Sequence, residues 1–228
     1  MPRSATRPTP PPSAGAVFGD RLDLACRFEQ LLASRATTRG LIGPRESGRL
    51  WERHLLNSAV ITELIPQATR VVDVGSGAGL PGIAMAIRRP DLHVDLVEPL
   101  QRRVEFLDEA VQSLQLTATV RVVRGRAEDV STAAVAGGAA WVTARAVAPL
   151  DRLVRWCLPL LRPGGTLLAL KGASAAVEVN AHQAVIHAIG GRDVTVLRCG
   201  EGILEQPTVV VVVRRGRQDA TDRKEGRA

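Results

Sequence analysis

Short β-branched runs alternate with helical segments through most of the chain, and this alternation restricts the fold more than any other feature. The runs are 71–74, 94–97, 120–123, 140–143 and 166–170, and the segments between them are 81–88, 102–114, 128–135 and 150–161. Consecutive strands that are separated by a helix pair in parallel, in a sheet that helices cover on both faces. The sequence therefore predicts a doubly wound α/β fold.

The two ends of this alternating region differ from its middle. After a helical segment over 175–189, the runs 194–198 and 209–213 have no helix between them, so we expect them to pair antiparallel. Before the first run, helical spacing begins after Asp20 and returns over 46–64. We predict a seven-stranded, mostly parallel sheet of the Rossmann-like kind, with an antiparallel last strand and an N-terminal helical extension.

Composition divides the chain into one domain and two tails. Residues 1–19 are rich in Pro and Arg and hold no acidic residue, and residues 214–228 carry six basic and three acidic side chains. We expect both tails to be disordered, which leaves one domain over 20–213, with helices over 20–66 and the sheet over 67–213. The net charge is +7, but the domain itself has 22 basic and 20 acidic side chains. The tails thus permit a polyanionic partner.

Other features exclude whole classes of protein. No run of about 18 apolar residues occurs, so we expect no membrane span. The three cysteines are scattered, as is usual for reduced thiols, and this favours a cytoplasmic location. His182 and His187 lie five apart, a poor spacing for a shared ion, so we expect no metal. We also expect a monomer.

A glycine-rich turn follows the first predicted strand. Gly75, Gly77 and Gly79 lie where this strand leads into a helix, the place at which doubly wound sheets bind their ligands. Glycines let the backbone turn sharply and approach a ligand without an intervening Cβ. Glu98 ends the second strand 23 positions after Gly75, where a carboxylate can accept hydrogen bonds from a ribose. The pattern predicts a site for a nucleoside cofactor.

Two cofactors fit this pattern. Residues 77–82 satisfy the GxGxxG pattern of dinucleotide-binding proteins, so an NAD(P)-binding oxidoreductase is one alternative. The glycines directly after the strand are instead spaced GxGxG, and Asp73 precedes Gly75 by two residues. This spacing and the antiparallel last strand resemble the class I methyltransferases that use S-adenosylmethionine (SAM).

Six segments together resemble a narrower family, the 16S rRNA guanine-N7 methyltransferases called RsmG or GidB. They are RHLLNS at 53–58, DVGSGAGLPG at 73–82, RVEFL at 103–107, GRAE at 125–128, ARA at 144–146 and LKG at 170–172. Their order and spacing cover about residues 20–213. Asn57 stands where this family often has Asp.

The resemblance implies an activity, namely methyl transfer from SAM to N7 of one guanine in 16S rRNA of the small ribosomal subunit. It also implies roles for particular residues. The expected cofactor contacts are Asp73, Gly75, Gly77, Gly79 and Leu80 in the glycine turn, Glu98 on the ribose, Ala127 and Glu128 on the adenine, and Arg145 on the cofactor or the base. Arg145 and Lys171 are the expected catalytic groups, because a cation can donate to guanine O6 or to a phosphate. The expected RNA contacts are Arg53, His54, Arg102 and Arg103, and the expected partner is 16S rRNA or the small subunit.

The residues also bear on which atom is methylated. Guanine N7 has a lone pair and no proton, so its methylation needs alignment rather than a strong base. Methylation of an exocyclic amine commonly uses an Asn/Asp-Pro-Pro-aromatic turn, but this chain reads TARA at 143–146 and has no Tyr. Methylation at C5 of cytosine needs a cysteine nucleophile, and Cys157 lies in an apolar helix.

Three alternatives to this function remain at the level of sequence. The first is a SAM-dependent methyltransferase for another RNA or a small molecule. The second is the NAD(P)-binding oxidoreductase, and the third is a non-catalytic RNA-binding module that keeps the fold.

Overall fold

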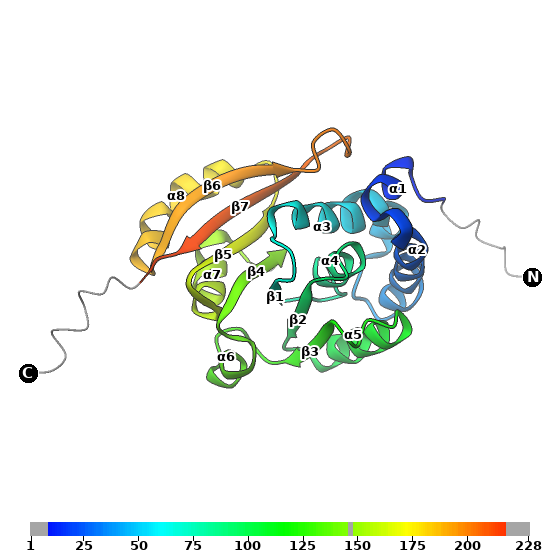
Figure 1. Ribbon diagram of the computed structural model, residues 1–228, viewed down its shortest axis with the longest axis horizontal. Helices are drawn as coiled ribbons and strands as arrows, with labels where there is room; N and C mark the ends of the chain where they lie inside the picture. The colour runs from blue at the N-terminus through cyan, green and yellow to red at the C-terminus, as the bar shows by residue number, and fades with distance from the viewer. Residues whose placement is uncertain (1–8, 146–147, 218–228) are drawn as a thin grey trace, which may run out of the picture.

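A seven-stranded sheet forms the centre of the molecule in the computed structural model, which describes residues 9–145 and 148–217. The strands are β1 (Arg70–Val74), β2 (His93–Glu98), β3 (Val120–Arg124), β4 (Ala139–Arg145), β5 (Leu161–Lys171), β6 (Gly191–Cys199) and β7 (Thr208–Arg215). Their order is β3-β2-β1-β4-β5-β7-β6 (Figure 1). The first five pair in parallel, whereas β7 lies between β5 and β6 and runs antiparallel to both. The predicted fold class is confirmed.

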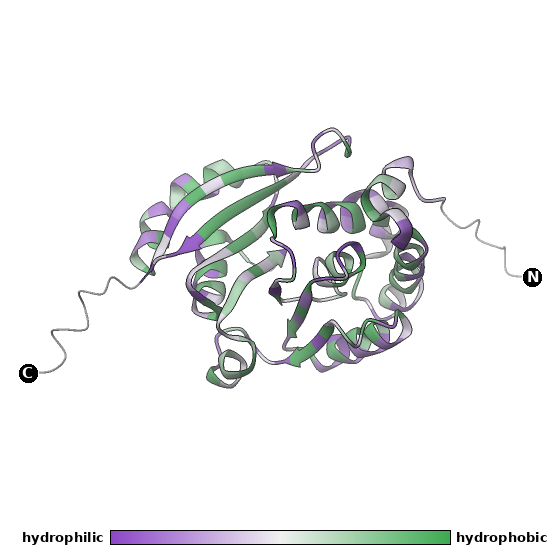
Figure 2. Ribbon diagram, viewed as in Figure 1, coloured by the Kyte–Doolittle hydropathy of each residue, from purple (hydrophilic) through white to green (hydrophobic). Residues whose placement is uncertain are grey.

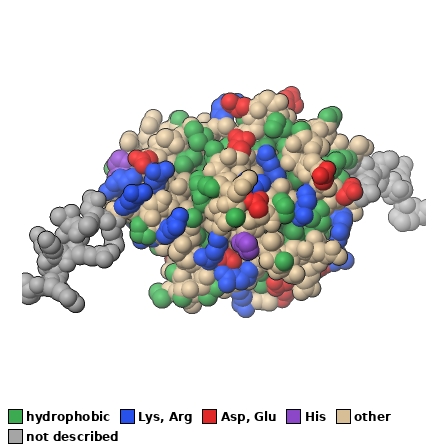
Figure 3. All heavy atoms as spheres, viewed as in Figure 1, with side chains coloured by type: hydrophobic (Ala, Val, Ile, Leu, Met, Phe, Trp, Pro, Cys, Tyr) green, Lys and Arg blue, Asp and Glu red, His purple; other side chains and the backbone are tan. Residues whose placement is uncertain are grey.

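Helices cover both faces of this sheet. They are α1 (Pro12–Phe18), α2 (Leu22–Leu31), α3 (Asn57–Val60), α4 (Gly82–Arg88), α5 (Gln101–Ser113), α6 (Val130–Ala136), α7 (Leu150–Cys157) and α8 (Ala175–Ala188). No helix among the described residues is long and apolar enough to cross a bilayer. Lys and Arg side chains gather at the end of the molecule where β6, β7 and α8 lie (Figure 3).

The alternation of side chains along each strand produces two hydrophobic cores, one on each face. In β1, Val71 joins the core beneath the N-terminal helices, α4 and α5, whereas Val72 and Val74 join the core beneath α6, α7 and α8. The central strands are mainly hydrophobic along their length, whereas the helices carry both hydrophobic and hydrophilic residues (Figure 2). This is the pattern of strands that are buried on both sides.

The expected helix over 46–64 is helical throughout but irregular. A 3₁₀ segment over Pro44–Arg49 leads into a π-helical stretch over Trp51–Leu56, then α3, then a 3₁₀ segment over Ile61–Leu64. In a π-helical stretch the backbone hydrogen bonds join residues five apart, and such stretches often occur at functional sites. The carbonyl oxygen of Arg53 accepts a hydrogen bond from the guanidinium of Arg145, at 3.2 Å. The irregular stretch is thus the part of the N-terminal region that contacts the end of β4.

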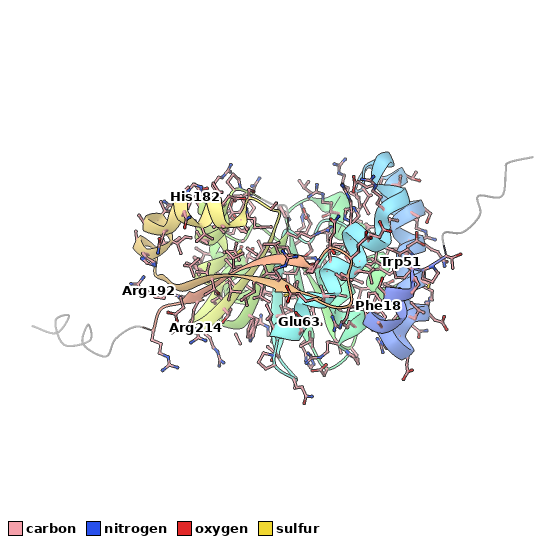
Figure 4. All side chains as sticks on the ribbon, turned by 90° about the horizontal axis from the view of Figure 1, so that it is seen from above. Phe18, Trp51, Glu63, His182, Arg192 and Arg214 are labelled. Carbon is pink, nitrogen blue, oxygen red and sulfur yellow. The ribbon has the colours of Figure 1, made fainter. Side chains whose placement is uncertain are left out.

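The structure corrects the expected domain boundaries at both ends. Residues 12–18 form α1 rather than a disordered tail, because Ala14, Val17 and Phe18 are buried and the Phe18 ring meets Trp51 edge-on (Figure 4). At the other end β7 continues past residue 213 to Arg215, whose guanidinium donates to the carbonyl oxygens of Pro159 and Leu161. The remaining parts of the expected tails, residues 1–8 and 218–228, lie outside the described residues.

The contact between α1 and Trp51 gives a test of the corrected N-terminal boundary. Phe18→Ala removes a side chain that is only 4% exposed, so the free energy of unfolding should fall by about 3 kcal/mol. Denaturant unfolding measures this loss. Val130→Ala, at an 86% exposed position, is the matched control and should change stability by less than about 0.5 kcal/mol. Equal stability of the two variants would show that α1 is not part of the folded domain.

Candidate active site

The loop after β1 takes a conformation that only glycines adopt easily. Gly75, Gly77 and Gly79 have φ values of 70°, 57° and 88°, in the left-handed region. The N–H groups of Gly75 and Ser76 both donate to the carbonyl oxygen of Val97, which ties the start of the loop to β2. The loop therefore presents backbone, rather than side chains, at the carboxyl end of the sheet.

The absence of a Cβ has one role at Gly79 and Gly82 and a different role at Gly77. A Cβ at Gly79 would overlap the side chain of Ile83, and one at Gly82 would overlap Leu96. These two glycines are therefore needed for packing of the loop and α4. A Cβ at Gly77 would meet nothing closer than the carbonyl oxygen of Gly75, at 3.8 Å. Gly77 therefore leaves space that a ligand can fill.

Asp73 holds the loop from below. Its carboxylate accepts hydrogen bonds from the N–H of Gly82 at 3.0 Å and from the hydroxyl of Thr143 at 3.2 Å. Burial raises the pKa of Asp73 to about 6, although these hydrogen bonds favour the ionised form. The side chain is fully buried and lies beneath the loop. The structure thus gives Asp73 an indirect part in the expected cofactor site.

Glu98 holds the same loop from the side. Its carboxylate accepts from the N–H groups of Gly77 and Leu100, each at 3.0 Å, and lies 3.5 Å from the guanidinium of Arg103. The side chain is only 1% exposed. In this structure it fixes the backbone of Gly77, and its expected hydrogen bond to a ribose stays a prediction.

Two hollows adjoin the loop on its ligand side and share Gly75. The first, which we call the glycine hollow, has a volume of about 250 Å³. Its lining includes Ser76, Gly77, Ala78 and Leu80 of the loop, Glu46 and His54 of the N-terminal region, Arg103 and Arg145. The second, which we call the β3 hollow, has a volume of about 180 Å³ and is lined by Ala127, Glu128 and Trp156 among others. Of the expected cofactor contacts, Gly75, Gly77 and Leu80 thus line one hollow, and the adenine contacts Ala127 and Glu128 line its neighbour.

A third hollow lies beyond Arg145, at the carboxyl ends of β4 and β5. This β5 hollow has a volume of about 290 Å³, and Arg53, Asn57, Arg145, Lys171 and Thr208 are among its lining residues. Arg145 lines both the glycine hollow and the β5 hollow. It therefore forms the boundary between the space beside the glycine loop and a second space of similar size. Ala146, the next residue of the ARA segment, lies outside the described residues.

Arg145 is held by hydrogen bonds to the N-terminal region. One terminal nitrogen donates to the carbonyl oxygen of Arg53 at 3.2 Å, and the other donates to Nδ1 of His54 at 3.0 Å. Burial lowers the pKa of Arg145, but a guanidinium keeps its charge in proteins. The structure brings Arg145 together with Arg53 and His54, two of the expected RNA contacts.

His54 is also bonded on its other side. Its Nε2 lies 2.9 Å from Oε2 of Glu46. Burial, and then the nearby charge of Arg145, lower the pKa of His54. The ring is therefore neutral at physiological pH, and its two nitrogens have different hydrogen-bonding roles.

Lys171 lies in the β5 hollow, but its ammonium group is already engaged. Nζ is 2.7 Å from Oε2 of Glu178 and donates to the carbonyl oxygen of Ala148 at 3.1 Å. The hydrogen bond with Lys171 holds the pKa of Glu178 below its usual range. Lys171 thus ties α8 to the segment after β4, and a direct role in catalysis stays a prediction.

The remaining predicted RNA contacts differ in how accessible they are. Arg53 and Arg102 are exposed, whereas Arg103 lines the glycine hollow and is paired with Glu98. Arg103 is therefore placed closer to the cofactor side than to an RNA surface. Among residues 9–145 and 148–217, no three His, Cys, Asp or Glu side chains lie together as metal ligands would.

Two residues of the site were missed by sequence reasoning. Glu46 lies in an irregular segment with no motif, so only the fold brings it to His54. Trp156 belongs to none of the motifs; it is half-buried, packs against the core beneath α6, α7 and α8, lines the β3 hollow, and has the guanidinium of Arg152 5.2 Å from its ring centroid.

Comparison with known proteins decides between a methyltransferase and an NAD(P)-binding oxidoreductase, both of which this geometry permits. The model of the family described as rRNA small subunit methyltransferase G (GidB) matches residues 21–209. This chain belongs to the rRNA small subunit methyltransferase G family. Two relatives carry the name ribosomal RNA small subunit methyltransferase G. The one from Salinispora arenicola is 58% identical and covers 94% of this chain and 92% of the relative, and the one from Mycobacterium marinum is 54% identical and covers 90% and 89%.

Solved structures with low sequence identity share the fold. The mitomycin 7-O-methyltransferase superposes with a TM-score of 0.59 at 19% identity, over 83% of this chain and 60% of that one. Aeropyrum pernix fibrillarin, solved with natively bound S-adenosyl-L-methionine, gives a TM-score of 0.51 at 17% identity, over 71% and 74%. Membership of the family confirms the methyltransferase interpretation and excludes the oxidoreductase alternative.

Because burial raises the pKa of Asp73 from 3.8 to about 6, ionised Asp73 destabilises the folded state above pH 6. This cost is absent below pH 4, where the carboxyl is protonated in both the folded and unfolded states. In Asp73→Asn the amide oxygen can accept the hydrogen bond from the N–H of Gly82, the amide nitrogen can donate to the hydroxyl of Thr143, and the side chain does not titrate. The free energy of unfolding of this variant minus that of wild type should therefore be about 2 kcal/mol higher at pH 7.5 than at pH 4.5, so the variant gains relative stability as the pH rises.

Denaturant unfolding of the ligand-free protein at the two pH values measures this difference. Other titrating groups change both proteins equally and cancel in the comparison. The same relative stability at both pH values would show that Asp73 is not destabilised by burial.

Proposed function

We propose that this chain transfers a methyl group from SAM to N7 of a guanine in 16S rRNA of the small ribosomal subunit. The observation that carries the proposal is the arrangement of two hollows on either side of Arg145, one beside the open Gly77 backbone and one at the ends of β4 and β5. A transferase that acts on a large substrate needs such a pair of adjoining spaces. Membership of the rRNA small subunit methyltransferase G family supports the choice of substrate.

The glycine loop fits a nucleoside cofactor with a methionine end. Gly75 and Gly77 leave backbone exposed, and Leu80 supplies an apolar wall. Ala127, Glu128 and Trp156 line the adjoining β3 hollow, where a flat apolar ring can pack against an aromatic side chain. When bound, SAM supplies an electrophilic methyl group on a sulfonium. Gly75, Gly77, Leu80, Ala127 and Glu128 are the residues that would hold it.

The β5 hollow offers donors that suit a guanine. Arg145 has five N–H groups, of which two donate hydrogen bonds among the described residues. The others are available to acceptors on the guanine, such as O6, or to a phosphate. N7 requires no deprotonation, so the chain needs groups that align the base and exclude water, and the neutral ring of His54 is consistent with that requirement.

An RNA substrate must present this guanine outside a regular helix. The major groove of duplex RNA is deep and narrow, so N7 can be reached only in a loop or after extrusion from the stack. Arg53 is exposed and lines the β5 hollow, and Arg102 is exposed at the start of α5; both suit phosphate contacts, which position the RNA without reading its sequence. We therefore propose 16S rRNA, free or in the small subunit, as the partner.

The placement of the cofactor can be tested with a pair of glycine variants. Gly77→Ala places a methyl group toward the glycine hollow at a cost of about 1 kcal/mol in backbone strain, and SAM affinity should fall at least tenfold, about 1.4 kcal/mol. Gly79→Ala adds overlap with Ile83 to the same strain, so the loss of stability should be larger, roughly 3 kcal/mol. Calorimetry gives the affinity and denaturant unfolding the stability. If SAM binds Gly77→Ala as tightly as wild type, the cofactor does not lie against this loop.

The reaction is tested by methylation of small subunits that lack this modification. Labelled methyl groups from SAM should appear as 7-methylguanosine in nucleosides digested from the 16S rRNA. Arg145→Ala should lower kcat/KM about 100-fold, because it removes the group that faces the acceptor. Label in another nucleoside, or in none with wild-type protein and intact subunits, would overturn the proposed reaction.

A further inference from the structure

Three charged or polar side chains from separate elements form a single hydrogen-bonded chain beside the site. Glu46 comes from the 3₁₀ segment Pro44–Arg49, His54 from the π-helical stretch Trp51–Leu56, and Arg145 from the end of β4. The distances are 2.9 Å from Glu46 Oε2 to His54 Nε2 and 3.0 Å from His54 Nδ1 to the Arg145 guanidinium. Glu46 belongs to none of the motifs in the sequence, and the reaction described above does not use it.

The donors and acceptors in this chain can be arranged in only one way. A guanidinium has no acceptor, so Nδ1 of His54 must accept the hydrogen bond from Arg145. The proton of the neutral ring is then on Nε2, from which it is donated to the carboxylate of Glu46. If the proton moved to Nδ1, two donors would face each other and the hydrogen bond between His54 and Arg145 would be lost. A carboxylate at Nε2 therefore stabilises the tautomer that holds Arg145.

The position of the chain explains why this orientation matters. All three side chains line the glycine hollow, but Arg145 alone among them also reaches the β5 hollow. The guanidinium is fixed from the N-terminal side, by His54 and by the carbonyl oxygen of Arg53. Its remaining N–H groups are therefore directed by contacts that begin at Glu46.

We propose that Glu46 is a positioning residue for methyl transfer, which fixes the tautomer and ring orientation of His54 and thereby aims Arg145 at the acceptor base. This inference rests on the proposed function, because it assigns the acceptor base to the space beyond Arg145. Glu46 has a second, weaker contact, in which its Oε1 lies 3.7 Å from Nη1 of Arg53 and both side chains are partly exposed. An exposed pair at this distance contributes little, so the contact with His54 is the one that gives Glu46 its role.

The first test is independent of catalysis. The chain has four histidines, and the ring nitrogen signals of His54 can be assigned in ¹⁵N NMR spectra by their loss in His54→Asn. At pH 7.5 wild-type His54 should be neutral with its proton on Nε2. In Glu46→Ala the signals should move toward a mixture of tautomers. A wild-type ring protonated on Nδ1, or identical spectra of wild type and Glu46→Ala, would overturn the proposal even if methylation proceeds as expected.

The second test separates positioning from cofactor binding. Glu46→Ala should lower kcat/KM for small subunits by about 10- to 100-fold, the range typical of losing a group that orients a functional side chain. SAM affinity by calorimetry should stay within about twofold of wild type. Glu46→Gln should recover part of the loss, because its amide oxygen can still accept from Nε2. Glu52→Ala, at an exposed position of the same helical region, is the control and should match wild type. A fall in SAM affinity equal to the fall in kcat/KM would make Glu46 a cofactor ligand and overturn the proposal.

The third test asks whether Glu46 acts through His54. Asparagine at position 54 can place an oxygen near Nδ1 to accept from Arg145, but it has no group that reaches Glu46. Adding Glu46→Ala to His54→Asn should therefore change kcat/KM by less than about twofold, although Glu46→Ala alone lowers it strongly. If the two losses multiply, Glu46 acts independently of His54 and the proposal is wrong. A wild-type protein that methylates no RNA would instead count against the proposed function and leave the NMR test to decide the role of Glu46.

Discussion

The candidate site depends on a glycine-rich loop whose backbone N–H groups donate to acceptors on the neighbouring strand β2. The turn after β1 has three glycines with φ values in the left-handed region. Residues that carry a Cβ adopt this conformation only with strain. Two buried carboxylates provide the support, Asp73 at the N–H of Gly82 and Glu98 at the N–H of Gly77. Both act from within the protein, so the opposite side of the loop stays open to a ligand. Burying Asp73 costs stability, as its raised pKa shows.

The N-terminal helical region completes the site from the other side. It contributes Glu46 and His54 to the glycine hollow and Arg53 to the β5 hollow, and it receives the guanidinium of Arg145 in its irregular stretch. The packing of Phe18 against Trp51 joins α1 to this irregular stretch. The N-terminal region is therefore part of the candidate site, although a doubly wound sheet alone has the usual place for a cofactor.

The sequence predicted the fold because its signals are local and repeated. Runs such as 94–97, flanked by helical spacing, could be read directly, and the absence of a helix between 198 and 209 correctly predicted that β6 and β7 pair antiparallel. The tails were less predictable, because the prolines of residues 8–12 indicated disorder, whereas burial of Phe18 outweighs that tendency. The glycine loop was placed correctly by its spacing. Glu46 and Trp156 were not found, since only tertiary packing brings them to the hollows.

The central claim is that the cofactor lies along the glycine loop with its reactive end toward Arg145. A crystal structure with S-adenosylhomocysteine tests this most directly. The account predicts ligand density against the backbone of Gly75 and Gly77, with the adenine in the β3 hollow and the sulfur facing the boundary with the β5 hollow. Density at another place, or a glycine hollow filled by the protein itself in the presence of saturating ligand, would contradict it.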